Sequence, residues 1–198
     1  MSSIKLTADS GGGTFEVKAP ASSGNTRSYT LPDVAGIATL GPILEFDQWY
    51  LTTDSVNTEG DITSGLSRMN FPGSASQIGT GMTESSGIFS FPRTGKYLVI
   101  CNGSLNCDGS DSVIIFTAAT TNNSSYSNVA LAMDGNNGSG NRTGGATSMF
   151  FLDVTDTSQV KVKFVVASLS NSSSIRGSSD PNAGAVATNF VFIRIGDT

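Results

Sequence analysis

Few residues in this sequence of 198 residues can do chemistry. It contains no histidine, which excludes Ser-His-Asp and Cys-His catalysis and any metal site built on imidazole. Glu45 and Asp47 lie two residues apart, so on a strand they share a face. Paired carboxylates can hydrolyse glycosides, but only in a groove at a suitable separation. No sequence feature supplies a groove, and we therefore interpret the pair as a polar strand face or a subunit contact.

Residues 134–141 carry oxygen ligands at alternate positions, as a calcium loop does. The run lacks the later bidentate glutamate of an EF-hand, so we expect an ordinary loop and predict neither a metal nor another cofactor. Cys101 and Cys107 both fall on odd positions of what can be one strand. A continuous strand would hold them about 20 Å apart, too far for a disulfide, whereas a bulge or turn at Asn102-Gly103 would change that distance. We expect two free thiols packed as small hydrophobic residues.

Composition and charge narrow the function classes further. With 37% hydrophobic residues and 23 glycines, the chain is too apolar for general disorder and suits an all-β protein with polar loops. A net charge of −5 with scattered Lys and Arg argues against a nucleic-acid partner. The first residues do not resemble a signal peptide and no apolar run approaches the ~20 residues of a membrane span, so we expect synthesis in the cytosol without membrane insertion.

Residues 1–41 differ from the rest of the chain. Their expected strands, at 4–6, 14–18, 29–32 and 37–40, are short and carry few apolar side chains. A unit of about 40 residues without a disulfide or a metal is seldom stable alone. We therefore predict a β-rich arm that orders against partner copies or a larger assembly; the alternative is a floppy tail.

Residues 42–198 are predicted to form the folded domain. Their strands are longer and are separated by Gly, Ser, Asn and Asp turns, without a helical period. Residues 85–101 read as a hairpin, with strand, tight turn at 92–95 and strand. About eight to ten such strands predict an antiparallel jelly-roll sandwich.

Two of these strands, 149–152 and 190–195, are apolar on both faces. Residues 160–164 instead alternate, with Val160, Val162 and Phe164 inward and two lysines outward. A strand that is apolar on both sides is buried on both sides, and the chain is too short to supply a second layer. Another subunit is the simplest cover, and the alternative is a cap of the chain's own loops.

Residues 87–99 resemble a signature of the jelly-roll family of tumour necrosis factor and the globular head of complement component-one-q: glycine, aromatic, x, proline, x, x, glycine, x, tyrosine. Residues 188–197 resemble its last strand, in the form common among bacteriophage structural proteins. The resemblance covers roughly residues 43–197 and implies a compact homotrimer whose inner-sheet strands pack around a three-fold axis. The trimer interface is then assigned to Phe150, Leu152, Val191, Ile193 and Ile195.

Residues 4–40 resemble a short element of phage tail-fibre and virion proteins, matched here by 15–17, by Ala-Pro-Ala at 19–21 and by 29–32. The resemblance implies attachment to other virion proteins, and we assign that role to Phe15, Val17, Tyr29 and Leu31. Long fibres carry many copies of the element, whereas this chain has one. A short fibre, a spike or a head decoration is favoured over a long shaft.

The expected function is contact with a host surface. The polar loops 53–67, 102–111, 120–128, 134–147 and 168–187 suit weak, multivalent binding of glycan, through Tyr126, Asn136, Arg142 and Arg176. We predict a non-enzymatic, trimeric phage virion protein, exposed on the particle as a tail-fibre or spike knob. The alternative is a capsid decoration protein docked by its arm. A glycan-degrading enzyme is disfavoured because the sequence lacks histidine, a convincing carboxylate pair and a long solenoid.

Overall fold

A computed structural model of the chain describes residues 3–7, 11–18, 24, 43–70, 76–170, 172–179 and 186–198. The chain divides into two compact units, Met1–Leu40 and Gly41–Thr198. The described residues contain strands and no helix, as the alternating apolar pattern predicts. The strands expected at 29–32 and 37–40 lie outside the described residues, and so do Tyr29 and Leu31.

In the first unit, β1 (Ser3–Thr7) and β2 (Thr14–Lys18) form an antiparallel hairpin. The register pairs Ile4 with Val17 and Leu6 with Phe15, so the apolar residues of the two strands oppose each other. The turn contains Gly11 and Gly12, with φ of +88° and +66°. Residues with a Cβ rarely adopt this conformation, which explains the glycine run.

In the described part of the second unit, one sheet has eight strands and the other has six. The strands within each sheet pair antiparallel, so the predicted antiparallel sandwich is confirmed. The larger sheet contains β3 (Glu45–Leu51), β4 (Ser55–Val56), β6 (Leu66–Arg68), β7 (Gln77–Ile78), β10 (Gly95–Asp108), β13 (Asn141–Val154), β15 (Ser174–Arg176) and β16 (Asn189–Gly196). The smaller contains β5 (Gly60–Asp61), β8 (Thr83–Ser85), β9 (Ile88–Ser90), β11 (Asp111–Thr120), β12 (Ser127–Asn136) and β14 (Lys161–Ala167).

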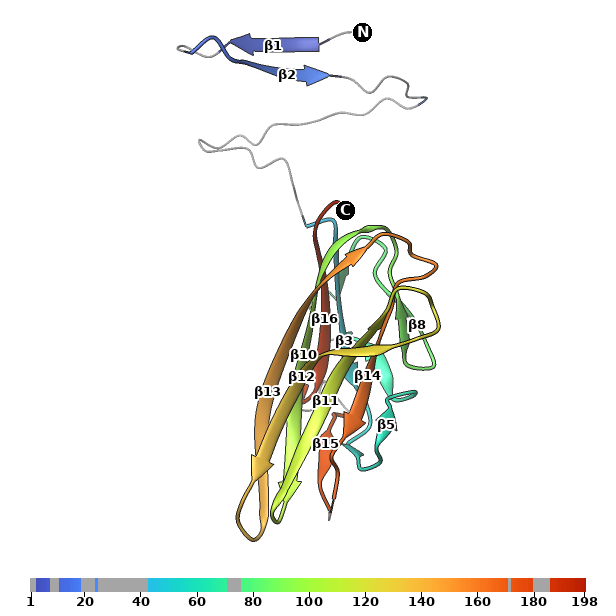
Figure 1. The fold of residues 1–198 in the computed structure, drawn as a ribbon, viewed down its shortest axis with the longest axis vertical. Helices are drawn as coiled ribbons and strands as arrows, with labels where there is room; N and C mark the ends of the chain where they lie inside the picture. Colours follow the sequence, from blue (N-terminus) through green and yellow to red (C-terminus); the bar gives the residue numbers. More distant parts are fainter. Residues whose placement is uncertain are drawn as a thin grey trace. The chain divides into compact units, whose positions relative to one another are not determined.

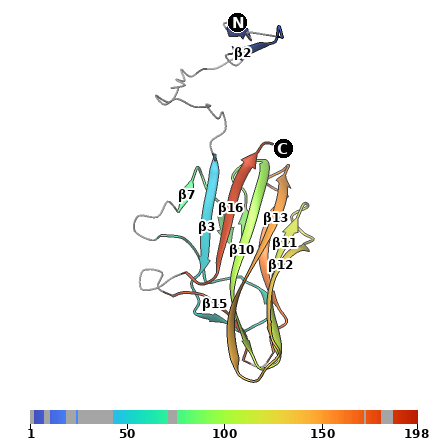
Figure 2. The same cartoon turned by 90° about the vertical axis from the view of Figure 1, so that its left-hand side faces the viewer.

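The eight-stranded sheet is centred on β10, which pairs with β13 along one edge and with β16 and β15 along the other. β16 pairs in turn with β3, so β13, β10, β16 and β3 lie side by side (Figure 2). The six-stranded sheet has the order β12-β11-β14-β9-β8, and its sixth strand, β5, pairs with β14. β3 begins where β16 ends, whereas the β10–β11 and β12–β13 turns lie at the opposite end of the sandwich (Figure 1).

The core lies between the two sheets and is rich in aromatic rings. Phe164 of β14 stacks on Phe190 of β16 with ring centroids 4.0 Å apart, and Phe89 of β9 meets Phe192 of β16 at 4.9 Å. Offset and edge-on ring pairs of this kind stabilise a core beyond the area they bury. Val160, Val162 and Phe164 are buried, as predicted from their alternation with lysines. Cys101 and Cys107 are buried free thiols on the core face of one continuous strand, also as predicted.

The expected hairpin over residues 85–101 is wrong. Its two strands are β9 and β10, which belong to different sheets and do not pair, so the turn carries the chain across the sandwich. Phe89 and Tyr97 alternate onto one core from opposite sheets, and period-two alternation looks the same in both arrangements. Gly95 in the crossing has a φ of +142°, and a Cβ there would lie 2.3 Å from Arg194 Nε.

Two segments expected to be loops, 102–111 and 134–147, are largely strand. β10 runs to Asp108, and β13 pairs with it without interruption from Asn141. Only the short turns around 109–110 and 137–140 leave the ladders. Their Asn, Gly and Ser content resembles that of loops, but much of it lies on solvent-facing positions of a sheet, where polar residues belong.

Candidate functional site: the apolar face of the eight-stranded sheet

The outward face of the eight-stranded sheet carries two apolar rows across four strands. The register places Phe151, Leu98, Ile193 and Phe46 in one row. Two residues along each strand, Met149, Ile100 and Val191 form the second row, which ends at Gln48 of β3. We call these seven residues the apolar face: Phe46, Leu98, Ile100, Met149, Phe151, Val191 and Ile193.

Strand alternation turns these side chains away from the core. On β16, Phe190 and Phe192 are buried while Val191 and Ile193 are only half-buried. On β13, Met149 and Phe151 are 64% and 52% exposed. A patch of large apolar side chains that is continuous across a sheet is uncommon on a monomer and marks a surface for association.

The structure places the five predicted interface residues on two different faces. Val191, Ile193 and the exposed Ile195 lie on the outward face of β16. Leu152 is part of the core cluster, and Phe150 packs against that cluster from a half-buried position. These two side chains therefore point into their own subunit, and their neighbours on β13 occupy the outward face.

The sequence interpretation missed five members of the face: Phe46, Leu98, Ile100, Met149 and Phe151. Residues 149–152 are apolar at both odd and even positions, so alternation alone does not show which side of the strand faces outward. Asp153 supplies the missing signal, because a charged side chain faces solvent and residues 149, 151 and 153 share one side of the strand.

The apolar face ends at a row of polar side chains. Thr147 Oγ1 donates to Asn102 Oδ1 at 2.9 Å, and Asn102 Nδ2 donates to Asn189 Oδ1 at 2.9 Å. These residues are in register with one another on β13, β10 and β16, two positions along each strand from Met149, Ile100 and Val191. The apolar face thus lies between Lys96 and Asp153, which are in register near the start of β3, and this polar row, which begins the half near the hairpin turns.

Glu45 and Asp47 are neither a polar strand face nor a subunit contact, because both side chains are buried. The oxygens of Asp47 accept from Arg68 Nε at 2.9 Å and Nη2 at 3.0 Å, from Trp49 Nε1 at 2.8 Å and from the Met82 amide at 2.6 Å. The Arg68 guanidinium also lies 4.8 Å from the centre of the Trp49 ring. A carboxylate held by this many donors is structural.

Glu45 completes the same cluster. Its Oε2 accepts the backbone amides of Thr80 and Gly81 at 2.9 and 3.1 Å, and its Oε1 pairs with Arg93 Nε at 2.7 Å. Together with Asp47 it fastens the 79–82 turn to the start of β3. Neither carboxylate is free to serve as an acid or a base.

Tyr126 is held against the six-stranded sheet and does not extend into solvent. Lys163 Nζ lies 4.5 Å from the centre of its ring and donates to Asp61 Oδ2 at 2.7 Å. Burial, together with the charge of Asp61, raises the pKa of the Tyr126 phenol. This ring therefore packs on the sheet and does not project outward as a receptor-contact residue would.

Asn136 and Arg142 are brought together around the β12–β13 turn, as the last residue of β12 and the second residue of β13. Arg142 Nη1 donates to Asp134 Oδ1 at 3.2 Å and to the Gly135 carbonyl. Arg176 is exposed at the end of β15, on another strand. The residues predicted for receptor contact thus belong to three separate places, and three of the four lie on strands.

The predicted anchoring residues fall in the first unit. Phe15 and Val17 belong to β2, where they oppose Leu6 and Ile4. Isolated two-stranded hairpins are at best marginally stable in water. The role of these residues stays a prediction.

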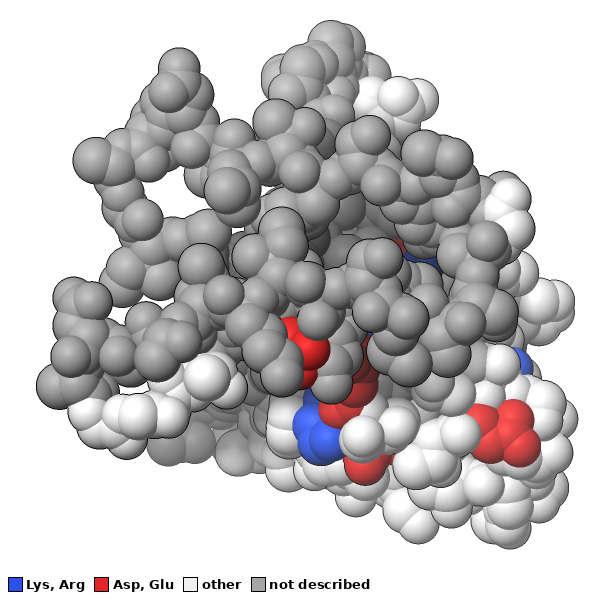
Figure 3. Space-filling model, turned by 90° about the horizontal axis from the view of Figure 1, so that it is seen from above, with Lys and Arg blue, Asp and Glu red and all other residues white. Residues whose placement is uncertain are grey.

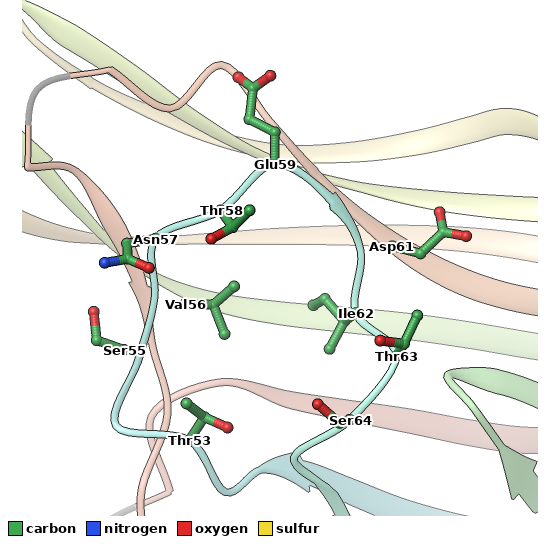
Figure 4. Close-up of a pocket in the computed structure, with 10 residues that line it drawn as sticks. All are labelled: Thr53, Ser55, Val56, Asn57, Thr58, Glu59, Asp61, Ile62, Thr63 and Ser64. Atoms are coloured by element: carbon green, nitrogen blue, oxygen red, sulfur yellow. The ribbon is translucent and has the colours of Figure 1, made fainter.

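Two of the hollows lined by described residues of the second unit are shallow. One, of about 350 Å³, is lined by residues of the segment 53–64, which includes β4 and β5; Val56 and Ile62 point toward each other across it, and the Glu59 carboxylate points away (Figure 4). The other, of about 600 Å³, lies between the turns at 108–110 and 137–139. Across the described segments, no group of three or more Cys, Asp and Glu is placed to hold a metal.

Charged residues make up 14% of the sequence. Where described residues are visible from above, Asp and Glu form small separate patches, one of which touches Lys or Arg atoms (Figure 3). Among the described residues no helix is present that could cross a membrane.

The fold matches solved structures of tumour necrosis factor type. Eiger TNF from S. frugiperda aligns with a TM-score of 0.56 at 12% identity, over 77% of this chain and 93% of that one. Murine APRIL aligns with a TM-score of 0.53 at 10% identity, over 76% and 98%. The PRD1 vertex protein P5 reaches 0.42 at 14% identity, over 79% and 100%, a score too low to support an argument.

No family model and no curated protein sequence matches the chain. The alignments nevertheless define the class of fold: the chain carries a jelly roll of the tumour necrosis factor type, as the sequence signature predicts. At such low identity the likeness establishes the fold and leaves the function to be argued from the surface.

Proposed function

We propose that the chain is the subunit of a homotrimeric phage virion protein, in which residues 42–198 form a knob that contacts the host surface. The observation that carries the proposal is the apolar face of the eight-stranded sheet. Three copies arranged about one axis would turn these faces toward each other and remove Phe151, Met149 and Ile193 from water. The homotrimer that the sequence signature implies supports the same arrangement.

The apolar face also supports association through one side of the sandwich. Its exposed members, Met149 and Phe151, lie on β13, which pairs in its sheet with β10 alone among the described strands. In a closed ring of three copies each interface uses the same two surfaces, so the apolar face of the eight-stranded sheet would be covered in every copy. The contact would then end at the polar row of Asn102, Asn189 and Thr147, on the side toward the hairpin turns.

The virion assignment comes from the first unit. Residues 4–40 resemble a phage tail-fibre element, and the hairpin β1–β2 is too small to be stable alone. We infer that Phe15, Val17, Tyr29 and Leu31 attach the trimer to other virion proteins. The host-facing end is then the end with the hairpin turns, opposite the start of β3, where Asn136 and Arg142 lie.

The ligand that suits this end best is a surface glycan. The turns at 108–110 and 137–139 offer hydroxyl, amide and carboxylate groups around a shallow hollow. Single contacts of this kind are weak, and three copies on one trimer compensate by avidity.

Localisation on intact particles tests this proposal. Gold-labelled antibody should mark the tail, with a few trimers per particle. A label spread over the head would instead assign a decoration role, with the arm docked on capsid proteins. Absence of the protein from purified particles would refute the virion assignment altogether.

A further inference from the structure

Two asparagines in the sequence are followed by glycine, Asn102-Gly103 and Asn137-Gly138. This dipeptide favours loss of the side-chain amide, because glycine has no Cβ to hinder the approach of its backbone nitrogen to the asparagine Cγ. The approach also requires a backbone that is free to rotate. The structure places the two pairs in opposite settings, which makes each the control for the other.

Asn137 lies in the turn between β12, which ends at Asn136, and β13, which begins at Asn141. It is therefore outside both strand ladders, and Asn137, Gly138 and Ser139 are all exposed. The nearest atom to a Cβ built on Gly138 would be Asn136 Oδ1 at 3.5 Å. The space around Gly138 is thus open, and the exposed Asn137 side chain is not packed into the sandwich.

We propose that Asn137 is a site of spontaneous deamidation. The backbone nitrogen of Gly138 gives up its proton and attacks Cγ of Asn137, and a bond forms between them. The bond from Cγ to the side-chain nitrogen breaks, and ammonia leaves with the proton. Water then opens the cyclic imide at either carbonyl, giving aspartate or isoaspartate. The reaction consumes water alone and needs neither an oxidant nor a cofactor.

Asn136 is a positioning residue that slows this reaction. Its Oδ1 accepts the Gly138 amide at 3.0 Å, and its Nδ2 donates to the Gly140 carbonyl at 2.8 Å. The Gly138 nitrogen must release this hydrogen bond before it can lose its proton and turn toward Cγ. The side chain of Asn136 therefore stabilises a conformation of the turn in which the Gly138 nitrogen does not attack Cγ.

Asn102 is protected. Asn102 and Gly103 lie within β10, between β13 and β16, and Gly103 is in register with Ala146. Both ends of the Asn102 amide are also held, by Thr147 at 2.9 Å and Asn189 at 2.9 Å. Attack would require β10 to separate from its neighbours, which amounts to local unfolding of the sheet.

The consequence is a new carboxylate beside the hollow that Asn137 shares with Asp108. Each modified chain would change its formal net charge from −5 to −6. The inference rests on local geometry and does not depend on the proposed function.

The test is peptide mapping by mass spectrometry after incubation of the full chain at mildly alkaline pH. Conversion should appear at Asn137 and remain undetected at Asn102. Gly138→Ala should slow it at least about tenfold, because the added methyl group hinders the nitrogen. Gly138 does not have a positive φ, so this variant should keep the wild-type melting temperature. Asn136→Ala should accelerate conversion about fivefold, the rate equivalent of one neutral hydrogen bond.

Equal conversion at Asn102 and Asn137 would overturn the proposal, and so would an unchanged rate in Gly138→Ala. An unchanged rate in Asn136→Ala, with Asn137 still converted, would refute the positioning role alone. Denatured chain provides the reference, since both asparagines should then react at similar rates.

Discussion

Arg68 grips both oxygens of Asp47, with Nε at 2.9 Å from Oδ1 and Nη2 at 3.0 Å from Oδ2. The two residues are 21 positions apart and join β6 to β3 at the end of the sandwich. Because Asp47 is 1% exposed, its charge depends on these donors for solvation. The pair is thus the centre of the cluster that fixes the start of β3.

Asp47→Ala should lower the free energy of unfolding by about 3 kcal/mol, the usual cost of leaving a buried charge without its partner. The variant leaves Arg68 without its ion-pair partner. It also leaves the Met82 amide and the Trp49 indole without their hydrogen-bond acceptor. Urea unfolding at a fixed protein concentration measures the change. Asp153→Ala is the matched control, because that carboxylate is exposed; a loss equal to that of Asp47→Ala would contradict the structural role of the cluster.

Ile193→Asp should convert trimers into monomers or aggregates, because it places a charge on the apolar face. Light scattering coupled to size exclusion measures the mass. Ile114→Asp is the control: Ile114 is half-buried on the outward side of β11, in the six-stranded sheet. Wild-type mass in Ile193→Asp would show that this face is not an interface.

Phe151→Ser and Leu152→Ala separate the two sides of β13. Phe151 is 52% exposed, so its replacement should weaken assembly and leave the melting of the separated subunit nearly unchanged. Leu152 is a core residue, and its truncation should cost about 3 kcal/mol of stability. The account would be contradicted if Leu152→Ala altered the mass of an otherwise stable protein, because the interface would then lie on the Leu152 side of β13.

Cys101 should be inert in the native protein. Complete burial raises the pKa of its thiol to about 12, against 9.0 for a free thiol. Above pH 9 the unfolded chain therefore binds fewer protons at this site than the native chain, and stability falls as pH rises from 9 toward 12. Thiol labelling at pH 8 should follow unfolding.

Cys101→Ala tests the cause of this pH dependence, because it should flatten the loss of stability that Cys101 contributes between pH 9 and 12. Tyr97 adds a loss of the same sign, since burial raises its pKa to about 12 as well. Rapid labelling of Cys101 under native conditions would contradict the buried, neutral thiol.

The sequence predicts the sandwich. It also predicts which side of a strand faces the core, wherever polar and apolar residues alternate along that strand. Lys161 and Lys163 reveal the core side of β14, and a run of phenylalanines at alternate positions reveals that of β16. Residues 149–152 of β13 are all apolar, so alternation does not show which side faces the core. The prediction that Phe150 and Leu152 face outward is wrong. Only Asp153 carried the information.

Contacts between residues far apart in the chain are not predicted from the sequence, for a different reason. Nothing near Glu45 in the chain indicates that it accepts amides 35 and 36 residues away. Likewise, alternation in β9 and β10 shows that both strands face a core but not that they face it from opposite sheets. Pairing across a sandwich is set by the whole packing, and a single sequence does not record it.

Sedimentation equilibrium of the purified chain tests the central claim most directly. If the apolar face is covered by two other copies, the wild-type protein should sediment at three times the mass of one chain across micromolar concentrations. A stable, soluble monomer over that range, with Phe151 and Ile193 left in water, would contradict it.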